Sequence, residues 1–240
     1  MCGRYALYAE NEELIDALSV EADAATPATE PRYNIAPTQE VPVVMRPTGA
    51  RRAGPRRLRM ARWGLVPPQW PTPDRRRTPL INARAEGIAR QPLFRGLFAG
   101  SRCIVPANGF FEWRRAGTVR QPYFMSHRDG VPLAFAAIRA RWQRDDFAPI
   151  ASCAIITVAA NEQLELLHDR MPAILDPAAW DLWLDPDAPR EAVCKLLRPL
   201  DDELALHPVT PRMNHHAFEC ADAVAPTSSE AEPGQLPLPW

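Results

Sequence analysis

Apolar residues gather in six short stretches of the first two thirds of the chain, and several of these alternate apolar with polar positions. The stretches cover residues 41–46, 57–63, 102–105, 122–126, 132–138 and 152–158. Pro, Gly and charged residues separate them, which is the pattern of β-strands joined by turns. Because the intervals are too short for regular βαβ units, the pattern predicts mainly antiparallel pairing.

Three short helices are predicted around these strands. Residues 11–18 form a helix capped by Asn11, residues 161–167 form one capped by Asn161, and a third begins at Asp176, which a proline follows. Together the elements predict an α+β fold. We expect mainly antiparallel sheets forming an open barrel-like core, flanked by short helices, in a single domain.

The last twenty residues differ in composition from the rest. Residues 221–240 are rich in Ala, Pro, Ser and Glu, which is typical of disordered segments. We therefore expect one folded, catalytic domain over residues 1–220 and a disordered tail over residues 221–240.

Charge is unevenly distributed, although the formal net charge is only −1 at pH 7. Between Val41 and Arg120 the chain has seventeen Arg against three acidic residues, Asp74, Glu86 and Glu112. Such asymmetry indicates a basic face, for which a nucleic acid is one partner. A solvated, arginine-rich surface without a partner is the alternative.

The cysteines exclude two classes of site. There are five, an odd number, and they lie far apart without a CxxC pair. This spacing argues against a disulfide framework and against zinc, so we expect no metal and no cofactor. No apolar run reaches the length of a membrane span, and the N-terminus lacks the regions of a signal peptide. We expect a cytoplasmic monomer without membrane contact.

Cys2 is the residue with the most distinctive chemistry. Small second residues generally permit removal of Met1, after which Cys2 carries a free α-amine beside its thiol. The reference pKa of an α-amine is about 7.7 to 8.0, so the amine is partly neutral near pH 7 and can form a Schiff base with an aldehyde. The thiol can then add to the imine carbon and close a five-membered thiazolidine, helped by the effective molarity of groups on one residue. A small residue that merely follows Met1 is the alternative.

Three further polar residues lie in apolar surroundings, where burial without a task is costly. Asn82 ends a short apolar stretch, and its side-chain amide is able to orient a substrate oxygen. The alternative is a helix cap or turn residue. Glu112 stands between aromatic residues, a setting that raises a carboxyl pKa and suits acid or base catalysis, or it is an exposed acid at a strand end. His168 follows a predicted helix and is either a proton shuttle or a surface residue.

Seven motifs in their order and spacing resemble those of the SOS-response-associated peptidase family, whose members process abasic sites in single-stranded DNA. The motifs are Cys2-Gly3-Arg4-Tyr5, Arg32-Tyr33-Asn34-Ile35-Ala36-Pro37, Arg62-Trp63-Gly64-Leu65-Val66-Pro67, Asn82-Ala83-Arg84-Ala85-Glu86, Arg102-Cys103-Ile104-Val105-Pro106-Ala107, Gly109-Phe110-Phe111-Glu112-Trp113 and His168-Asp169-Arg170-Met171-Pro172. The resemblance runs from Cys2 to about Asn214. Ala137, Arg139 and Met213 depart from the usual Gly, Trp and Val, which concerns local packing more than chemistry.

The resemblance implies that Cys2 captures the ring-opened aldehyde of an abasic deoxyribose and ends as a thiazolidine cross-link. Glu112 and His168 would move protons, and Asn82 would hold the Cys2 amine or the sugar. The same resemblance implies a set of DNA-contacting residues: Arg4, Arg84 and Arg170 at phosphates, Trp70 and Trp113 as aromatic platforms, and Asn34, Pro37 and Thr157 beside the site. The protein would associate with the nucleoid when bound to DNA.

The chain end suggests a further partner. Gln235 to Trp240 resembles the short glutamine-leucine peptides with which bacterial DNA-repair proteins bind the replication sliding clamp. An unstructured proline-rich end is the alternative.

Two other function classes remain open from the sequence. The first is an N-terminal nucleophile amidohydrolase of the glutamine amidotransferase type, which also begins Met-Cys-Gly and whose oxyanion-binding Asn-Gly pair has an echo in Asn108 and Gly109. The second is a single-stranded DNA-binding module without chemistry, for which Arg4, Arg84 and Trp113 would suffice.

Overall fold

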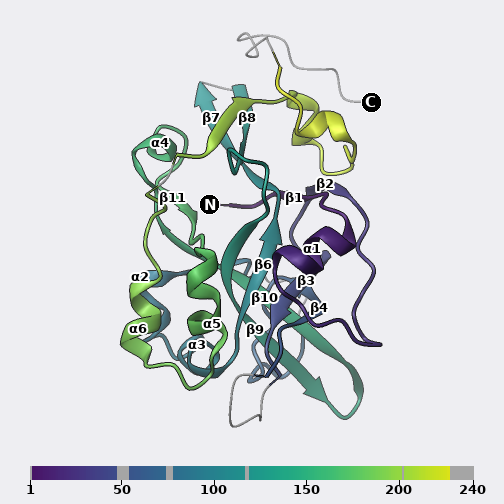
Figure 1. Ribbon diagram of the computed structural model, residues 1–240, viewed down its shortest axis with the longest axis vertical. Coiled ribbons are helices and arrows are strands. Elements are labelled where there is room, and N and C mark those ends of the chain that lie inside the picture. Colours follow the sequence, from purple (N-terminus) through teal and green to yellow (C-terminus); the bar gives the residue numbers. More distant parts are fainter. Residues whose placement is uncertain (1, 48–53, 74–77, 117–118, 202, 228–240) are drawn as a thin grey trace.

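A computed structural model describes residues 2–47, 54–73, 78–116, 119–201 and 203–227, which form two sheets with short helices around them (Figure 1). The strands are β1 (Tyr5–Leu7), β2 (Arg32–Ile35), β3 (Glu40–Met45), β4 (Arg57–Trp63), β5 (Asn82–Arg84), β6 (Arg102–Ala107), β7 (Gly109–Ala116), β8 (Val119–Ser126), β9 (Leu133–Arg144), β10 (Phe147–Ala159), β11 (Arg170–Pro172) and β12 (Ala205–Pro208). The helices are α1 (Asn11–Ala17), α2 (Ala85–Ile88), α3 (Arg95–Gly100), α4 (Glu162–Glu165), α5 (Trp180–Leu184) and α6 (Arg190–Lys195), with single 3₁₀ turns η1 (Pro177–Ala179), η2 (Pro211–Asn214) and η3 (Ala221–Ala223).

The larger sheet closes into a barrel. Its strands pair in the order β10, β4, β3, β6 and β9, and β9 pairs again with β10. Within this ring the β4–β10 pairing is parallel and the other four are antiparallel. Buried side chains such as Val44, Ile104 and Ile138 fill the core. The predicted α+β class with a barrel-like core is confirmed, and the double pairing of β9 closes the barrel.

The smaller sheet has the order β12, β8, β7, β1 and β2 and lies across one end of the barrel (Figure 1). Its strand β1 begins three residues after Cys2 and pairs with β2 and β7. The chain passes from β6 into β7 through Asn108 alone. The N-terminal segment is therefore held between β2 and β7, where the two sheets meet.

The Asn108–Gly109 step is fixed by sterics and hydrogen bonds. A Cβ at Gly109 would lie 2.3 Å from the Met125 carbonyl oxygen, so only glycine fits there. The side-chain oxygen of the buried Asn108 accepts hydrogen bonds from the backbone N–H groups of Tyr8 and Ala9. These contacts give the pair a structural role, which accounts for one of the two observations that favoured the amidohydrolase.

The six predicted strands all exist, and most extend beyond their predicted ends. The helix at Asn161 is capped as predicted, since its side chain accepts from the Leu164 N–H, but it is shorter than expected. The cap predicted at Asn11 is wrong. Glu10 precedes the first turn, and the Asn11 side chain accepts instead from the backbone and hydroxyl of Thr29.

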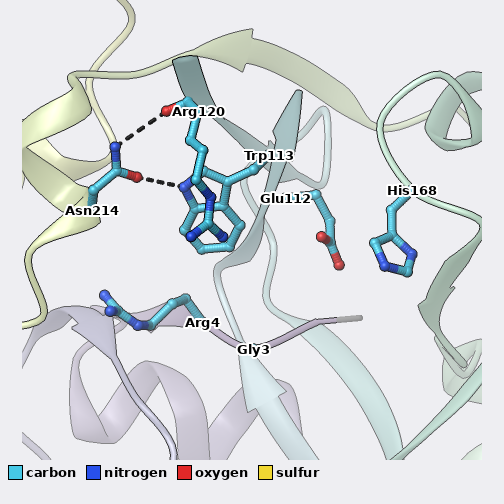
Figure 2. A pocket seen from close by; sticks show the side chains of 7 residues that line it. All are labelled: Gly3, Arg4, Glu112, Trp113, Arg120, His168 and Asn214. Carbon is cyan, nitrogen blue, oxygen red and sulfur yellow. Dashed lines mark hydrogen bonds between the residues drawn. The ribbon is translucent and has the colours of Figure 1, made fainter. Parts of the chain in front are cut away.

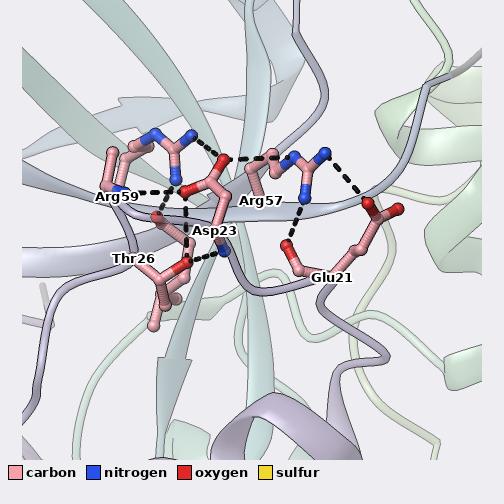
Figure 3. Close-up of polar contacts among 7 residues, drawn as sticks. Glu21, Asp23, Thr26, Arg57 and Arg59 are labelled. Atoms are coloured by element: carbon pink, nitrogen blue, oxygen red, sulfur yellow. Dashed lines mark hydrogen bonds and ion pairs between the residues drawn. The ribbon is translucent and has the colours of Figure 1, made fainter.

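Ion pairs hold the loop after α1 against strand β4 of the barrel (Figure 3). Arg57 contacts Glu21 at 3.1 Å, and Arg59 contacts Asp23 at 2.6 Å, which holds the pKa of Asp23 below its usual range. Farther along, Arg46 and Arg56 share Asp181. Four arginines of the basic stretch are thus paired with acidic residues from other parts of the chain.

The fold continues past the predicted domain boundary at residue 220. Residues 221–223 form η3, Pro226 bridges to Val209, and the Thr227 N–H donates to the Pro208 carbonyl. The remainder of the predicted tail, with the clamp-like segment Gln235 to Trp240, lies outside the described residues.

Two of the departures from the family pattern are absorbed by packing, because Ala137 and Met213 are both completely buried. Within the described ranges no helix has the length and apolar character to cross a membrane. The same ranges contain no group of His, Cys, Asp or Glu able to hold a metal ion.

Candidate functional site

A pocket of about 350 Å³ opens where the N-terminal segment meets the smaller sheet (Figure 2). It is lined by Gly3, Arg4, Glu112, Trp113, Arg120, His168 and Asn214. Four of these residues were predicted from the sequence to be functional. A larger cavity of about 800 Å³ near α5 is lined by none of the candidate residues. The smaller pocket is therefore the candidate site.

Cys2 lies buried beside this pocket and is held through its backbone. The side-chain nitrogen of Asn82 donates to the Cys2 carbonyl at 2.9 Å. Burial raises the pKa of the Cys2 thiol well above its usual range, and the charge of Glu112 adds to the rise. The thiol therefore stays protonated near neutral pH, with a carboxylate near enough to influence it.

Glu112 is a buried carboxyl on β7, only 3% exposed. The alternative of an exposed strand-end acid is therefore wrong. Burial raises its pKa to about 7, with a further contribution from the Asp169 charge. Figure 2 shows its carboxylate on the same side of the pocket as the His168 ring. Since both of its protonation states are populated at neutral pH, Glu112 can both accept and donate a proton.

His168 is placed by its two neighbours in the sequence. Its Nδ1 accepts the Arg170 backbone N–H at 2.9 Å and lies 2.8 Å from an oxygen of Asp169. In the neutral ring, the Nδ1 lone pair accepts the Arg170 N–H. In the protonated ring, the Nδ1 proton is donated to the Asp169 carboxylate. Each state of His168 thus has a partner, which suits a group that takes up and releases a proton.

Some buried polar atoms have no hydrogen-bond partner among the described residues. They include the side-chain oxygen of Asn82 on β5 and the hydroxyl of Thr157 on β10. The strands pair in parallel with Asn82 opposite Ile155, and because alternate residues share a face, Thr157 lies on the same face as Asn82. Since buried polar groups in native proteins are nearly always paired, these two atoms point to a ligand.

Arg170 is a buried arginine in an ion pair with the largely exposed Glu86. Its guanidinium contacts both carboxylate oxygens of Glu86, at 2.6 and 3.0 Å, and donates to the Thr157 carbonyl. This contact lowers the pKa of Glu86. The arrangement ties β11 to α2 and supports His168 and Thr157. A phosphate contact by Arg170, implied by the resemblance, stays a prediction that the geometry does not favour.

Asn34 is a buried hub that holds the C-terminal segment against the site. Its side-chain nitrogen lies within hydrogen-bond distance of the carbonyls of Met213, His215 and Phe218. Its oxygen accepts from the Arg4 guanidinium at 2.6 Å. Asn34 therefore positions Arg4 and η2. It was expected beside the site, and it contacts the site through Arg4.

Replacing Asn34 by Ala is expected to lower the free energy of unfolding by about 2 to 3 kcal/mol, because the part-buried carbonyls of His215 and Phe218 lose this donor and Arg4 loses its acceptor. Residues 211–227 should also become sensitive to protease. Urea unfolding and limited proteolysis measure the two effects, with Asn11→Ala as the control for loss of a surface asparagine. Equal stability of the two variants would contradict the role of this hub.

The remaining predicted contacts lie elsewhere. Trp70 is away from the pocket lining, and its carbonyl accepts from the Trp142 indole. Pro37 is half-buried in the loop between β2 and β3, and Arg84 is exposed at the end of β5. Their proposed contacts with DNA stay predictions.

Sequence reasoning missed Arg120, Asn214 and Asp169. The Trp113 indole donates to the Asn214 side-chain oxygen at 2.6 Å, and the Asn214 side-chain nitrogen donates to the Arg120 carbonyl at 3.2 Å. The sequence did carry a signal for Asp169, which adjoins His168, and for Asn214, where the family resemblance ends. It carried none for Arg120, whose position depends on the β7–β8 pairing.

Comparisons with known proteins give consistent matches. A family model described as SOS response associated peptidase (SRAP) matches residues 1–216. Abasic site processing protein YoqW of Bacillus subtilis is 32% identical over 217 residues, covering 89% of this chain and 94% of its own. Abasic site processing protein YedK of Escherichia coli is 35% identical over 188 residues, covering 77% and 79%. Abasic site processing protein HMCES of Gallus gallus is 31% identical over 224 residues, covering 82% and 66%.

Solved structures show the same fold. A protein from Bacteroides thetaiotaomicron superposes with a TM-score of 0.79 at 23% identity, covering 94% of this chain and 100% of that one. A phage-related protein from Bordetella bronchiseptica superposes with a TM-score of 0.66 at 28% identity, covering 87% and 94%.

Proposed function

The chain belongs to the SOS response associated peptidase family, which confirms the resemblance of its motifs, and on this basis we propose that it processes abasic sites in single-stranded DNA by covalent capture through Cys2. Met1 is first removed, by the protein itself or by an aminopeptidase. The Cys2 α-amine then attacks the aldehyde carbon of the ring-opened deoxyribose. Water leaves and an imine forms.

The thiol completes the capture. Its sulfur adds to the imine carbon, its proton is passed to the imine nitrogen, and a thiazolidine closes. The net change is the loss of one water from the Met1-less protein and the DNA. An imine alone permits β-elimination and strand scission, so ring closure protects the lesion.

The observation that carries this proposal is the setting of Cys2. Its carbonyl is held by Asn82, and its thiol lies near the carboxyl of Glu112, whose pKa of about 7 suits proton transfer. Because burial keeps the thiol protonated, the amine reacts first and the thiol needs a base when it adds. Glu112 supplies that base, and the thiol adds second because the imine carbon it attacks exists only after the amine has reacted.

The other residues divide the remaining work. His168 exchanges protons with the sugar oxygen during ring opening, in either of its supported states. The unpartnered oxygen of Asn82 and hydroxyl of Thr157 receive the Cys2 amine or a sugar hydroxyl. Both groups gain the hydrogen bonds that they lack.

DNA is held through its backbone in this proposal, so noncovalent affinity is expected to fall as salt rises. Contacts by Arg4, Arg84 and Arg120 give a slope of about −2 for log affinity against log salt, at roughly −0.7 per phosphate on a single strand. Fluorescence anisotropy with a labelled abasic strand and the Cys2→Ala variant measures it without cross-linking. A slope near zero would contradict phosphate binding.

Intact mass spectrometry tests the whole proposal. The protein is incubated with a single strand containing one abasic site, and a matched strand with an intact base is the control. The expected mass equals Met1-less protein plus DNA minus one water, on the abasic strand only. Absence of an adduct overturns the proposal, and an adduct that retains Met1 overturns the role of the α-amine.

A further inference from the structure

We propose that Trp113 and Arg120 together form a stacking site for the nucleobase next to the abasic nucleotide, and that capture consequently favours a purine at that position. This inference rests on the proposed function. Trp113 is already expected to be an aromatic platform; what is new is that Arg120, beyond the phosphate contact proposed above, contacts a base and sets a preference for it.

The Trp113 indole and the Arg120 residue contact each other directly and are also linked through Asn214. The Arg120 guanidinium carbon lies 5.9 Å from the centre of the Trp113 ring, within the range of a cation–π contact. Asn214 accepts the indole N–H and donates to the Arg120 carbonyl. Trp113 is thereby fixed at its edge, and Arg120 covers its ring.

The pocket has two chemically different ends (Figure 2). Glu112 and His168 occupy one end, and Trp113, Arg120 and Arg4 occupy the other. An abasic nucleotide has no base to stack. When its sugar reacts at the Glu112 end, the first base available to the aromatic end is the one on a neighbouring nucleotide.

Arg120 is the better placed of the two arginines at this end for contact with a base. The Arg4 guanidinium is engaged with Asn34 and with the Met213 carbonyl. Arg120 is exposed and has no ion pair among the residues that the structure describes. A guanidinium plane stacks on an aromatic ring and on a base alike, and a purine offers a larger face than a pyrimidine.

The test uses single strands with one abasic site, flanked on either side by a purine or a pyrimidine. Single-turnover cross-linking rates are measured for the parent protein, Arg120→Ala and Arg120→Lys. Noncovalent affinities are measured for the same three proteins with Cys2→Ala added. Arg141→Ala is the matched control, since Arg141 is also an exposed strand arginine but lies on the β9–β10 hairpin. Thermal unfolding of each variant establishes that it is folded.

We expect a purine on one side of the lesion to give affinities and rates about fivefold higher than a pyrimidine. Arg120→Ala removes this difference and lowers purine-strand affinity about fivefold or more. Arg120→Lys keeps the salt dependence but loses the preference, because an ammonium has no plane to stack. Arg141→Ala behaves as the parent protein.

Two results would overturn the inference alone. One is cross-linking that is independent of the neighbouring base, and the other is equal behaviour of Arg120→Ala and Arg141→Ala. Failure to cross-link any abasic strand, with the parent protein, overturns the proposed function and this inference with it.

Discussion

Replacing Cys2 by Ala is expected to abolish the stable covalent product with an abasic single strand while leaving noncovalent affinity within about twofold. The variant keeps an α-amine after Met1 removal, so it still forms an imine, but no thiol is present to close the ring. The imine then hydrolyses or eliminates. Stable product should fall by about two orders of magnitude or more, because the intramolecular nucleophile and its effective molarity are lost.

Cys2→Ser separates the two nucleophiles. It keeps the amine and replaces the thiol by a weaker nucleophile, so borohydride should trap an adduct and strand scission should increase over the parent protein. Cys220→Ala is the control, since Cys220 is a half-buried thiol outside the pocket. Denaturing gels measure product and scission together. Stable product from Cys2→Ala would refute the thiazolidine.

Glu112→Gln is expected to slow cross-linking by about a hundredfold or more, which is the usual contribution of a positioned acid or base. The amide has nearly the same shape but cannot take up a proton at neutral pH. The parent rate should change through pH 7, where Glu112 titrates, and the variant should lose this inflection. Glu203→Gln, an exposed acid paired with Arg128, serves as the control. A variant with the parent's rate and pH profile would exclude Glu112 from the proton transfers.

The same substitution changes how stability depends on pH. The pKa of Glu112 rises from an ordinary 4.5 to about 7 on folding, so between these values the folded state binds more protons than the unfolded state. Its contribution to stability is therefore complete below pH 4.5 and is lost as pH rises through 7. The parent should lose about 3 kcal/mol more than Glu112→Gln between pH 4 and 8. Urea unfolding of both proteins at the two pH values measures this difference.

Alternation and turn residues were enough to predict the barrel strands, because each buries one or both faces in the common core. Strand β4 has its predicted bounds, and β9 and β10 only extend farther as a hairpin. Strands β1, β5 and β11 have three residues each, too few for a periodic pattern. Yet these short strands carry the site, since β1 follows Cys2, β5 begins with Asn82 and β11 follows His168.

The candidate residues were identified by motif, whereas their partners depend on tertiary structure. Nothing local to Asn34 indicates that it holds carbonyls from residues more than 170 positions away. The same is true of Arg170, for which the resemblance implies a phosphate contact and which the fold buries beside Glu86 and the Thr157 carbonyl. Long-range pairing decides which charged residues face solvent, and a sequence pattern does not contain it.

The pocket joins Gly3 and Arg4 to Asn214, so the two ends of the domain must meet before it exists. During synthesis the N-terminus leaves the ribosome first, while η2 is made nearly last. An exposed aminothiol in an unfinished chain would react with any aldehyde in the cell without the help of Glu112 or the selectivity of the pocket. Because the pocket is built from both ends, a nascent or truncated chain lacks it. Under the proposed function, only a completed chain would therefore bring a reactive terminus to DNA.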